Sequence, residues 1–342
     1  MKAIRFLLFP FAVLYDGVTS VRNTFYNKGF FKSTRFEIPV IAVGNLSVGG
    51  TGKTPQIEYL IRLLQGSYNV AVLSRGYKRK TEGFILLNDQ HSAEDVGDEP
   101  LQFYKKFPKV SVAVDANRVN GIQQLKTKIN PDIVLLDDAY QHRKVEASFY
   151  VLLTKYDDLY SEDFVLPTGN LRESRRGAKR ANVIVVTKCP ETLSETEQKR
   201  IIQKLKPEAN QSIFFSTINY QERTKGNQQL SLDELKEYEI FLITGIANPK
   251  PLLSFLEKQE CKFEHLKFPD HHNFTTQEIE KIQTQFESIT SKKKILLTTE
   301  KDYMRLSDKI SDLSYLEIES KLIAKKEDFD QQIAIAVNSK RV

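Results

Sequence analysis

The stretch "SVGGTGKTP" (residues 47–55) follows the apolar run "IPVIAVGN" (residues 38–45). Glycines at this density add little to a hydrophobic core, but they let backbone N–H groups turn inward around an anion. Gly52, Lys53 and Thr54 occupy the last three positions of the phosphate-binding pattern G-x-x-x-x-G-K-[S/T]. The sequence therefore predicts that the chain leaves a strand, wraps around a phosphate and enters a helix.

The first position of that pattern is Ser47 rather than glycine, so the match is incomplete by one residue. Gly49 and Gly50 lie inside the loop and supply compensating flexibility. The alternative is an ordinary glycine turn that caps a helix, but lysine and threonine at a helix start are what phosphate and magnesium require. The residues expected to bind a nucleotide are Ser47, Val48, Gly49, Gly50, Thr51, Gly52, Lys53 and Thr54.

Short apolar runs alternate with helix-like stretches around this loop. Because the runs are apolar nearly throughout, both faces of each strand are expected to be covered, as in a parallel sheet between helices. The predicted strands span 39–44, 69–74, 109–114, 132–138, 149–154 and 182–188, and the predicted helices span 53–66, 98–106 and 117–128. The predicted fold class is α/β, with a P-loop NTPase-like parallel sheet flanked by helices.

A polar segment over residues 191–235 separates this block from a second one and contains one strand-like run, 212–220. The second block begins with an apolar run at 239–249 and continues with a predicted helix near 249–259. Its last motif lies at 293–302. We predict a P-loop domain over 1–217 and a smaller α/β domain over 218–342, with an approximate boundary. The prediction leaves open whether the C-terminal end returns to the first domain.

Composition limits the class of protein. Of the 342 residues, 40% are hydrophobic and 27% are charged, which suits one large or two ordinary domains and argues against wholesale disorder. Cys189 and Cys261 are too few for a disulfide framework and match no zinc-binding pattern, so a reducing cytosol is expected. The net charge of +6 suits nucleic acid, an anionic membrane or phosphorylated substrates, and does not choose among them.

The N-terminus contains an apolar run over residues 6–15, shorter than the roughly 20 residues that a bilayer-spanning helix needs. Pro10 is expected to start or kink a helix here. Apolar residues recur at spacings of three and four and share one helical face: Ile4, Leu7, Phe11, Leu14, Val18, Val21 and Phe25. Flanked by lysines and arginines, this face suits the surface of an anionic membrane, and it equally suits packing in a core.

A second acidic site is expected beside the loop. The predicted strand "DIVLLDD" ends with Asp137 and Asp138, and a carboxylate at such a strand tip can help to hold Mg²⁺. Two aspartates after a strand are otherwise often a turn signal. With Thr54 at the helix start, the sequence predicts a magnesium site that uses Asp137 or Asp138.

Further polar stretches are "SRGY" (74–77), "GDEP" (97–100), "DDAYQHRKV" (137–145), "LPTGNLRE" (166–173), "TKCP" (187–190), "GIANP" (245–249), "FPDHHNF" (268–274) and "TEKD" (299–302). Each alone fits a cap, a turn or a surface hydrogen bond, and Asp98 of "GDEP" fits a helix N-cap. In this order, with "VGNLSVGGTGKTP" (43–55), they resemble the tetraacyldisaccharide 4'-kinase family of Gram-negative bacteria. One small departure is Ala139-Tyr140, where the family more often has Gly-Phe.

The resemblance implies transfer of the γ-phosphate of ATP to the 4'-hydroxyl of a tetraacyldisaccharide 1-phosphate, which gives a 1,4'-bisphosphorylated lipid A precursor. It implies ATP and Mg²⁺ as cofactors and two hinged lobes that close over the nucleotide. It also implies peripheral attachment to the cytoplasmic face of the inner membrane. The expected partners are the lipid disaccharide and the membrane surface, with no nucleic acid and no obligate protein partner.

The resemblance also implies roles for individual residues. Asp98 would be the general base, His271 would orient it or tune its pKa from the second lobe, and Lys53 would neutralise the phosphates. A base completed only on closure would limit hydrolysis of ATP by water. Glu99 joins the candidate metal ligands Thr54, Asp137 and Asp138. The candidate substrate-binding residues are Arg75, Tyr77, Gln141, His142, Asn170, Arg172 and Glu173.

Two other functions are compatible with the phosphate-binding loop. A P-loop NTPase that acts as a nucleotide-dependent switch at the membrane would turn over ATP without a sugar acceptor and would not need Asp98 or His271. A nucleotide-gated membrane-binding module would depend on the N-terminal helix, and Lys53 would only gate binding. Dependence of ATP turnover on a lipid disaccharide distinguishes these functions from the kinase.

Overall fold

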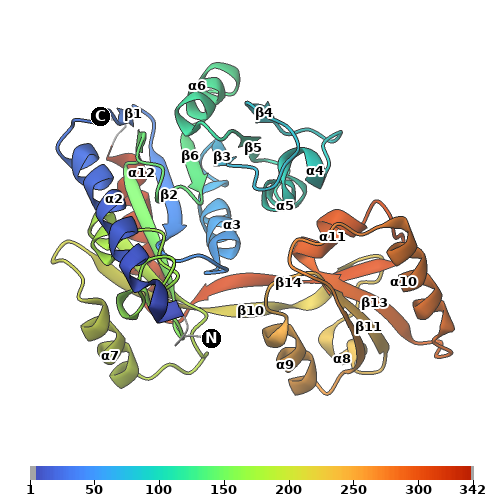
Figure 1. Cartoon of the computed structure of the whole chain (residues 1–342). Helices are drawn as coiled ribbons and strands as arrows, with labels where there is room; N and C mark the ends of the chain where they lie inside the picture. Colours follow the sequence, from blue (N-terminus) through green and yellow to red (C-terminus); the bar gives the residue numbers. More distant parts are fainter. Residues whose placement is uncertain (1–4, 340–342) are drawn as a thin grey trace.

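In the computed structural model, which describes residues 5–339, two lobes are joined by a pair of long strands (Figure 1). These strands, β10 (Ser212–Gly226) and β14 (Leu313–Leu322), pair antiparallel and run from one lobe into the other. A sheet of 12 strands therefore extends through both lobes in the order β12-β11-β13-β14-β10-β9-β8-β2-β6-β3-β5-β4. Residue 217, the predicted domain boundary, lies within β10.

The sheet of the first lobe is parallel from β10 to β5, and β4 pairs antiparallel at its edge. Its strands are β2 (Val40–Asn45), β3 (Val70–Ser74), β4 (Ile85–Leu86), β5 (Ser111–Val114), β6 (Ile133–Asp137), β8 (Phe149–Lys155) and β9 (Val183–Thr187). A separate parallel pair is β1 (Thr34–Arg35) with β7 (Val145–Glu146). Every residue of β2, β3, β6 and β9 is buried, which confirms the predicted parallel sheet with both faces covered.

The helices of this lobe are α2 (Phe9–Asn27), α3 (Lys53–Leu64), α4 (Ala93–Val96), α5 (Asp98–Lys106), α6 (Arg118–Lys128), α7 (Glu195–Leu205) and α12 (Lys326–Asn338), with 3₁₀ turns at Phe6–Leu8, Tyr160–Glu162 and Arg175–Arg180. α3, α5 and α6 occupy the three predicted helical stretches. α12 belongs to the C-terminal end of the chain, yet Phe329 and Ile333 are buried in the same core as Ile41 of β2. α12 therefore packs against the first lobe (Figure 1).

The second lobe repeats the α/β pattern on a smaller scale. Its strands are β11 (Glu239–Thr244), β12 (Lys262–Lys267) and β13 (Lys294–Thr299), and its helices are α8 (Leu232–Leu235), α9 (Lys250–Lys258), α10 (Thr276–Ser288) and α11 (Glu300–Leu306). β12, β11, β13 and the first half of β14 pair in parallel. The predicted fold class, an α/β P-loop-type sheet with a second smaller α/β lobe, is confirmed.

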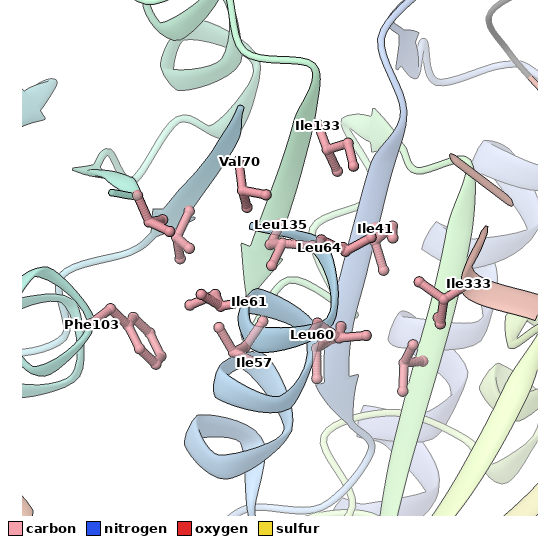
Figure 2. Packing of buried hydrophobic residues seen from close by; sticks show 14 of the residues in the cluster. Ile41, Ile57, Leu60, Ile61, Leu64, Val70, Phe103, Ile133, Leu135 and Ile333 are labelled. Atoms are coloured by element: carbon pink, nitrogen blue, oxygen red, sulfur yellow. The ribbon is translucent and has the colours of Figure 1, made fainter. Parts of the chain in front are cut away.

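The largest core lies where α3 covers the sheet (Figure 2). α3 directs Ile57, Leu60, Ile61 and Leu64 toward β2 and β6, because residues three and four apart share one helical face. Ile333 of α12 packs on the same core from the other end of the sequence. The helix that starts at Lys53 is thus fixed rigidly on the sheet, which holds the phosphate-binding loop in place.

A close approach just before this loop predicts a stability effect. In Gly44→Ala the new Cβ would lie 2.7 Å from Cβ and 3.0 Å from the backbone nitrogen of buried Tyr140. Because neither atom can rotate away, the substitution is expected to lower the free energy of unfolding by about 1–3 kcal/mol. Urea denaturation measures this change.

The matched control is Gly17→Ala on the exposed side of α2, where an added Cβ meets no described atom within 4 Å. Alanine favours a helix over glycine by about 0.5–1 kcal/mol, so this variant is expected to be slightly more stable. An equal unfolding midpoint for Gly44→Ala and the parent chain would show that the strand accommodates the methyl group.

α2 lies along the outside of the first lobe (Figure 1) and starts near Pro10, as predicted. Ala12 and Thr19 face the protein, whereas the predicted apolar face points outward. The exposed fractions of that face are 78% for Leu7, 62% for Phe11, 68% for Leu14, 63% for Val18, 54% for Val21 and 40% for Phe25, and Ile4 lies outside the described residues. The alternative in which this face packs in a core is therefore wrong. No helix among residues 5–339 has the length and apolar character needed to cross a bilayer.

Candidate active site

The phosphate-binding loop leads from β2 into α3 with two glycines in the left-handed region. Gly49 has φ +103° and Gly52 has φ +84°, conformations that L side chains rarely adopt. The loop is braced from the ends of neighbouring elements: Asn45 donates to the Thr51 hydroxyl (2.7 Å), and the Thr187 hydroxyl donates to the Thr51 carbonyl oxygen (2.8 Å). The loop therefore has a shape fixed by contacts outside it, and Thr187 belongs to the predicted "TKCP" motif.

Other contacts hold the two ends of the loop. Ser47 bridges to Leu171, and the Val48 N–H donates to the backbone oxygen of Asn170 (2.8 Å). On the other side Lys188 donates to the carbonyl oxygen of Gly50 (2.8 Å). Asn170, a candidate substrate residue, thus contacts the loop through its backbone.

Lys53 at the start of α3 faces the acidic end of β6. Its Nζ lies 3.6 Å from Oδ1 of Asp138, and Nη1 of Arg172 lies 3.0 Å from the same oxygen. Burial raises the pKa of Asp138, but the charges of Lys53 and Arg172 outweigh burial and hold that pKa below its usual range. Asp138 is therefore ionised beside the loop, and the predicted proximity of the loop and the acid pair is confirmed.

Asp137 is buried behind Asp138 and accepts a hydrogen bond from the Ser74 hydroxyl (2.9 Å). Burial, followed by the negative charges of Glu99 and Asp138, raises the pKa of Asp137 to about 7. Carboxylates that repel one another in this way suit a divalent cation. Within residues 5–339 no three His, Cys, Asp or Glu side chains converge as a metal cage. Mg²⁺ commonly uses one or two carboxylates and completes its shell with water and phosphate oxygens, so the donor set fits that ion.

Asp98 and His271 meet across the two lobes. Asp98 is the first residue of α5, and His271 lies in the loop after β12 with φ +57°. Nδ1 of His271 lies 2.9 Å from Oδ2 of Asp98, and both side chains are largely buried. The N-cap of α5 is Gly97, so the alternative in which Asp98 serves as the helix cap is wrong.

Two cations of α11 surround this pair. Lys301 lies 3.0 Å from Nε2 of His271, and Arg305 forms a bidentate contact with both oxygens of Asp98. Nη2 of Arg305 also lies 2.8 Å from Nδ1 of His271, so the ring is held between two cations and the carboxylate of Asp98. Burial raises the pKa of Asp98, but the hydrogen bonds from His271 and Arg305 and the charges of Arg305 and Lys301 lower it more. Asp98 is therefore ionised near neutral pH.

Sequence reasoning did not single out Lys301 or Arg305. Lys301 lies in the quoted motif "TEKD", and Arg305 follows it by one helical turn on α11. The available signal was this spacing of four, which places two cations on one face of a short helix. Lys301 also lies 3.4 Å from Glu99, so the same lysine contacts both the imidazole beside the candidate base and a candidate metal ligand.

Three candidate substrate residues join a network with α2 instead of lying free. Gln141 donates to Glu173 (3.0 Å), Asn23 of α2 donates to Glu173 (2.6 Å), and Arg180 binds both oxygens of Glu173. Arg172, besides contacting Asp138, accepts a hydrogen bond from the Tyr15 hydroxyl at its carbonyl oxygen. The exposed apolar helix is therefore coupled to the acidic end of β6.

The remaining candidate substrate residues differ in their exposure to solvent. Arg75 is exposed, and Tyr77, also exposed, places its ring 5.4 Å from that of His271, centre to centre. His142 follows the acid pair, and its Nε2 is buried without a protein partner among the described residues. Burial and the charges of Arg118 and Lys144 lower the pKa of His142 to about 4, so its ring is neutral. A neutral imidazole here can donate or accept a hydrogen bond.

Comparison of the sequence with known proteins gives matches to one family. Residues 4–338 match the family model described as tetraacyldisaccharide-1-P 4'-kinase (LpxK). A protein called tetraacyldisaccharide 4'-kinase from Flavobacterium johnsoniae is 56% identical over 339 residues, which cover 97% of each chain. A protein of the same name from Bacteroides thetaiotaomicron is 41% identical over 347 residues, which cover 95% of this chain and 91% of the other.

A solved structure agrees with the fold described above. The crystal structure titled as the "apo" form of LpxK from Aquifex aeolicus in complex with ATP superposes with a TM-score of 0.80 at 30% identity. The superposition covers 98% of this chain and 99% of that one, so both lobes are shared. From these matches, this chain belongs to the tetraacyldisaccharide-1-P 4'-kinase family.

Proposed function

We propose that this chain transfers the γ-phosphoryl group of ATP to the 4'-hydroxyl of a tetraacyldisaccharide 1-phosphate, with Asp98 as the general base. Family membership over nearly the whole chain supports the reaction. The observation that carries the residue assignment is the contact of 2.9 Å between Asp98 and His271, which come from different lobes. A hydrolytic switch has no need for such a pair, so the contact favours the kinase over that alternative.

A sugar hydroxyl is a weak nucleophile at neutral pH, and a positioned base must take its proton as the new bond forms. Asp98 is ionised and can accept that proton at a lone pair not used by its partners. His271 orients the carboxylate through its Nδ1 contact, and Lys301 holds the ring from the other nitrogen. The proton acceptor is therefore complete only when both lobes contribute, which limits transfer to water.

The glycine loop and Lys53 bind the phosphates of ATP. The amides of residues 47–54 surround the phosphates, and Lys53 neutralises charge that grows on the transferred group. Mg²⁺, when bound, offsets charge on the phosphate oxygens, and Thr54, Asp138, Asp137 and Glu99 are the side chains that would hold it. Arg172 and Lys53, which now share Asp138, provide further positive charge beside the acid pair.

The reaction is tested by measuring ATP turnover with and without a tetraacyldisaccharide 1-phosphate dispersed in detergent, with mass detection of the product. The kinase assignment predicts turnover that depends on the acceptor and a product heavier by one phosphoryl group. Equal ATP turnover without the acceptor would favour the nucleotide-dependent switch instead.

We also propose that α2 attaches the protein to the membrane surface as a peripheral element on the cytoplasmic face. The support is the row of exposed apolar side chains on one face of α2, with Phe30 71% exposed and Phe31 44% exposed beyond its end. Lys28, Lys32 and Arg35 follow in the sequence and can contact anionic headgroups. Such a position would bring the acyl chains of the substrate close to the acid pair.

Membrane attachment predicts a partition experiment. Phe11, Leu14 and Val18 are all more than half exposed, so replacing the three by serine should leave the fold intact. Because each large side chain contributes up to about 1.5–3 kcal/mol on burial, vesicle partition is expected to fall by at least about 10-fold. Co-sedimentation with vesicles containing phosphatidylglycerol measures this.

The matched control for that experiment is Ile335→Ser, which removes an equally exposed apolar side chain (58%) from α12. It is expected to leave partition unchanged. Equal partition of the triple variant and the parent chain would mean that α2 does not contact the bilayer. Substitution is cleaner than deletion of residues 1–30, because Tyr15 and Asn23 contact residues near the site.

A further inference from the structure

Lys106, the last residue of α5, is buried among three carboxylates. Its Nζ lies 2.8 Å from Glu58, 2.8 Å from Glu300 and 3.5 Å from Glu317. The exposed fractions of the four side chains are 9% for Lys106, 1% for Glu58, 4% for Glu300 and 7% for Glu317. We call these four residues the inter-lobe charge cluster.

Each carboxylate of the cluster comes from a different structural element. Glu58 lies on α3, one turn beyond the phosphate-binding loop, and Glu300 is the first residue of α11 in the second lobe. Glu317 lies on β14, one of the two strands that connect the lobes (Figure 1). Lys106 is therefore the cation at which the loop helix, the Asp98 helix, the second lobe and the connecting strand meet.

The charges of the cluster do not balance without Lys106. Arg62 contacts Glu58 (3.2 Å) and Lys225 contacts Glu317 (2.9 Å), but both cations are partly exposed, so water screens them. Burial, followed by the charge of Glu58, raises the pKa of Glu300 to about 8. Burial would lower the pKa of Lys106, but Glu58 and Glu300 outweigh it and raise that pKa. Removal of the ammonium would leave buried carboxylates from both lobes facing one another.

The same two helices carry the groups of the active site. α5 begins with Asp98 and ends with Lys106. α11 begins with Glu300 and continues with Lys301 and Arg305, which contact His271 and Asp98. An ion pair thus joins the end of α5 to the start of α11.

We propose that Lys106 is a positioning residue, which holds α11 against α5 and α3 so that Asp98 and His271 meet when the lobes come together. The proposal rests on the function proposed above, because its kinetic readout is phosphoryl transfer. It goes beyond that function because it states that the inter-lobe charge cluster sets the relative position of the two lobes. The cluster is buried and lies outside the residues assigned to nucleotide or sugar. A structural measurement in the same experiment separates the two ideas.

The kinetic test uses Lys106→Met, which keeps most of the side-chain volume and removes the charge. Misplacement of catalytic groups by about 1 Å can cost roughly 10²-fold, so kcat is expected to fall by about that factor. The KM for ATP is expected to stay within about threefold, since the loop and Lys53 belong to one lobe. The matched control is Lys105→Met, whose exposed contact with Asp308 (3.9 Å) also joins the two lobes and should change neither constant.

The structural test measures the distance between spin labels on the two lobes. Labels at Gln123→Cys on α6 and Lys258→Cys on α9, both exposed, are placed in a chain with Cys189→Ser and Cys261→Ser. With ATP present, Lys106→Met is expected to give a longer and broader distance distribution than the parent chain. Loss of turnover in the parent chain itself would count against the proposed function, and the distances would still test the cluster.

A second variant keeps the proposal testable if Lys106→Met does not fold. Glu300→Gln leaves the Lys106–Glu58 pair intact inside the first lobe and removes the carboxyl group contributed by the second lobe. It is expected to lower kcat by about 10-fold and to broaden the label distances while the chain stays folded. Parent-like distances in Glu300→Gln, or a kcat of Lys106→Met within about threefold of the parent, would overturn the proposal.

Discussion

Replacing Asp98 by asparagine is expected to lower phosphoryl transfer by about 10²–10⁴-fold while ATP still binds, the usual size of the loss of a general base. The amide keeps the shape of the carboxylate but cannot take a proton from the sugar hydroxyl. The amide oxygen can still accept from Arg305, and the other contacts between α5 and α11 remain, so the lobes are expected to stay together. Steady-state kinetics with saturating ATP and acceptor give kcat, and isothermal titration gives ATP affinity.

The control for this variant is Glu94→Gln on the neighbouring helix α4, an exposed carboxylate that pairs with exposed Lys80. It loses the same charge close in sequence and is expected to keep the parent rate. Transfer by Asp98→Asn within about threefold of the parent would remove Asp98 from the base role. A thermal melt of both variants shows whether any loss of rate comes from unfolding.

Replacing Lys53 by methionine is expected to lower kcat/KM for ATP by about 10²–10³-fold, as for other preorganised groups that stabilise transition-state charge. Lys53 is partly buried at the start of α3 and has an acidic neighbour, Asp138, at 3.6 Å. Its charge is thus held in place before phosphates arrive, and methionine removes it without a large change in volume. Unlike Asp98→Asn, this variant is expected to weaken ATP binding as well.

The control for Lys53→Met is Lys126→Met on α6, whose lysine forms a surface pair with exposed Glu37. Removal of that surface charge should leave kcat/KM for ATP unchanged. Near-parent kinetics of Lys53→Met would mean that the glycine loop does not bind the transferred phosphate. Asp98→Asn and Lys53→Met therefore separate proton transfer from phosphate binding.

Local patterns in the sequence were sufficient to predict the parallel strands of the first lobe and the helices α3, α5 and α6. Strands such as 69–74 and 182–188 are apolar nearly throughout because helices cover both faces, and this pattern can be recognised from the sequence alone. The phosphate-binding loop at 47–55 could be predicted because its glycines and lysine lie within one short stretch of sequence. Asp98 and His271 are 173 residues apart, and only the resemblance of their motifs to a known family predicted that they act together.

Other features depend on packing that sequence patterns do not show. β14 and α12 were not predicted, although α12 contributes Phe329 and Ile333 to the main core. Lys106 is an ordinary helix-terminal lysine by pattern, and only the fold places three carboxylates around it. The spacing of apolar residues predicted the apolar face of α2, but periodicity gives no information on what covers that face. The structure leaves that face exposed.

A double-mutant cycle on the pair that joins the lobes tests directly whether Asp98 and His271 act as one unit. The rates of Asp98→Asn, His271→Gln and the double variant are measured under single-turnover conditions with saturating ATP and acceptor. If the carboxylate and the imidazole act as one unit, the double variant is expected to react within about threefold of the slower single variant. Losses that multiply would show that the two side chains act independently, and this would contradict the account.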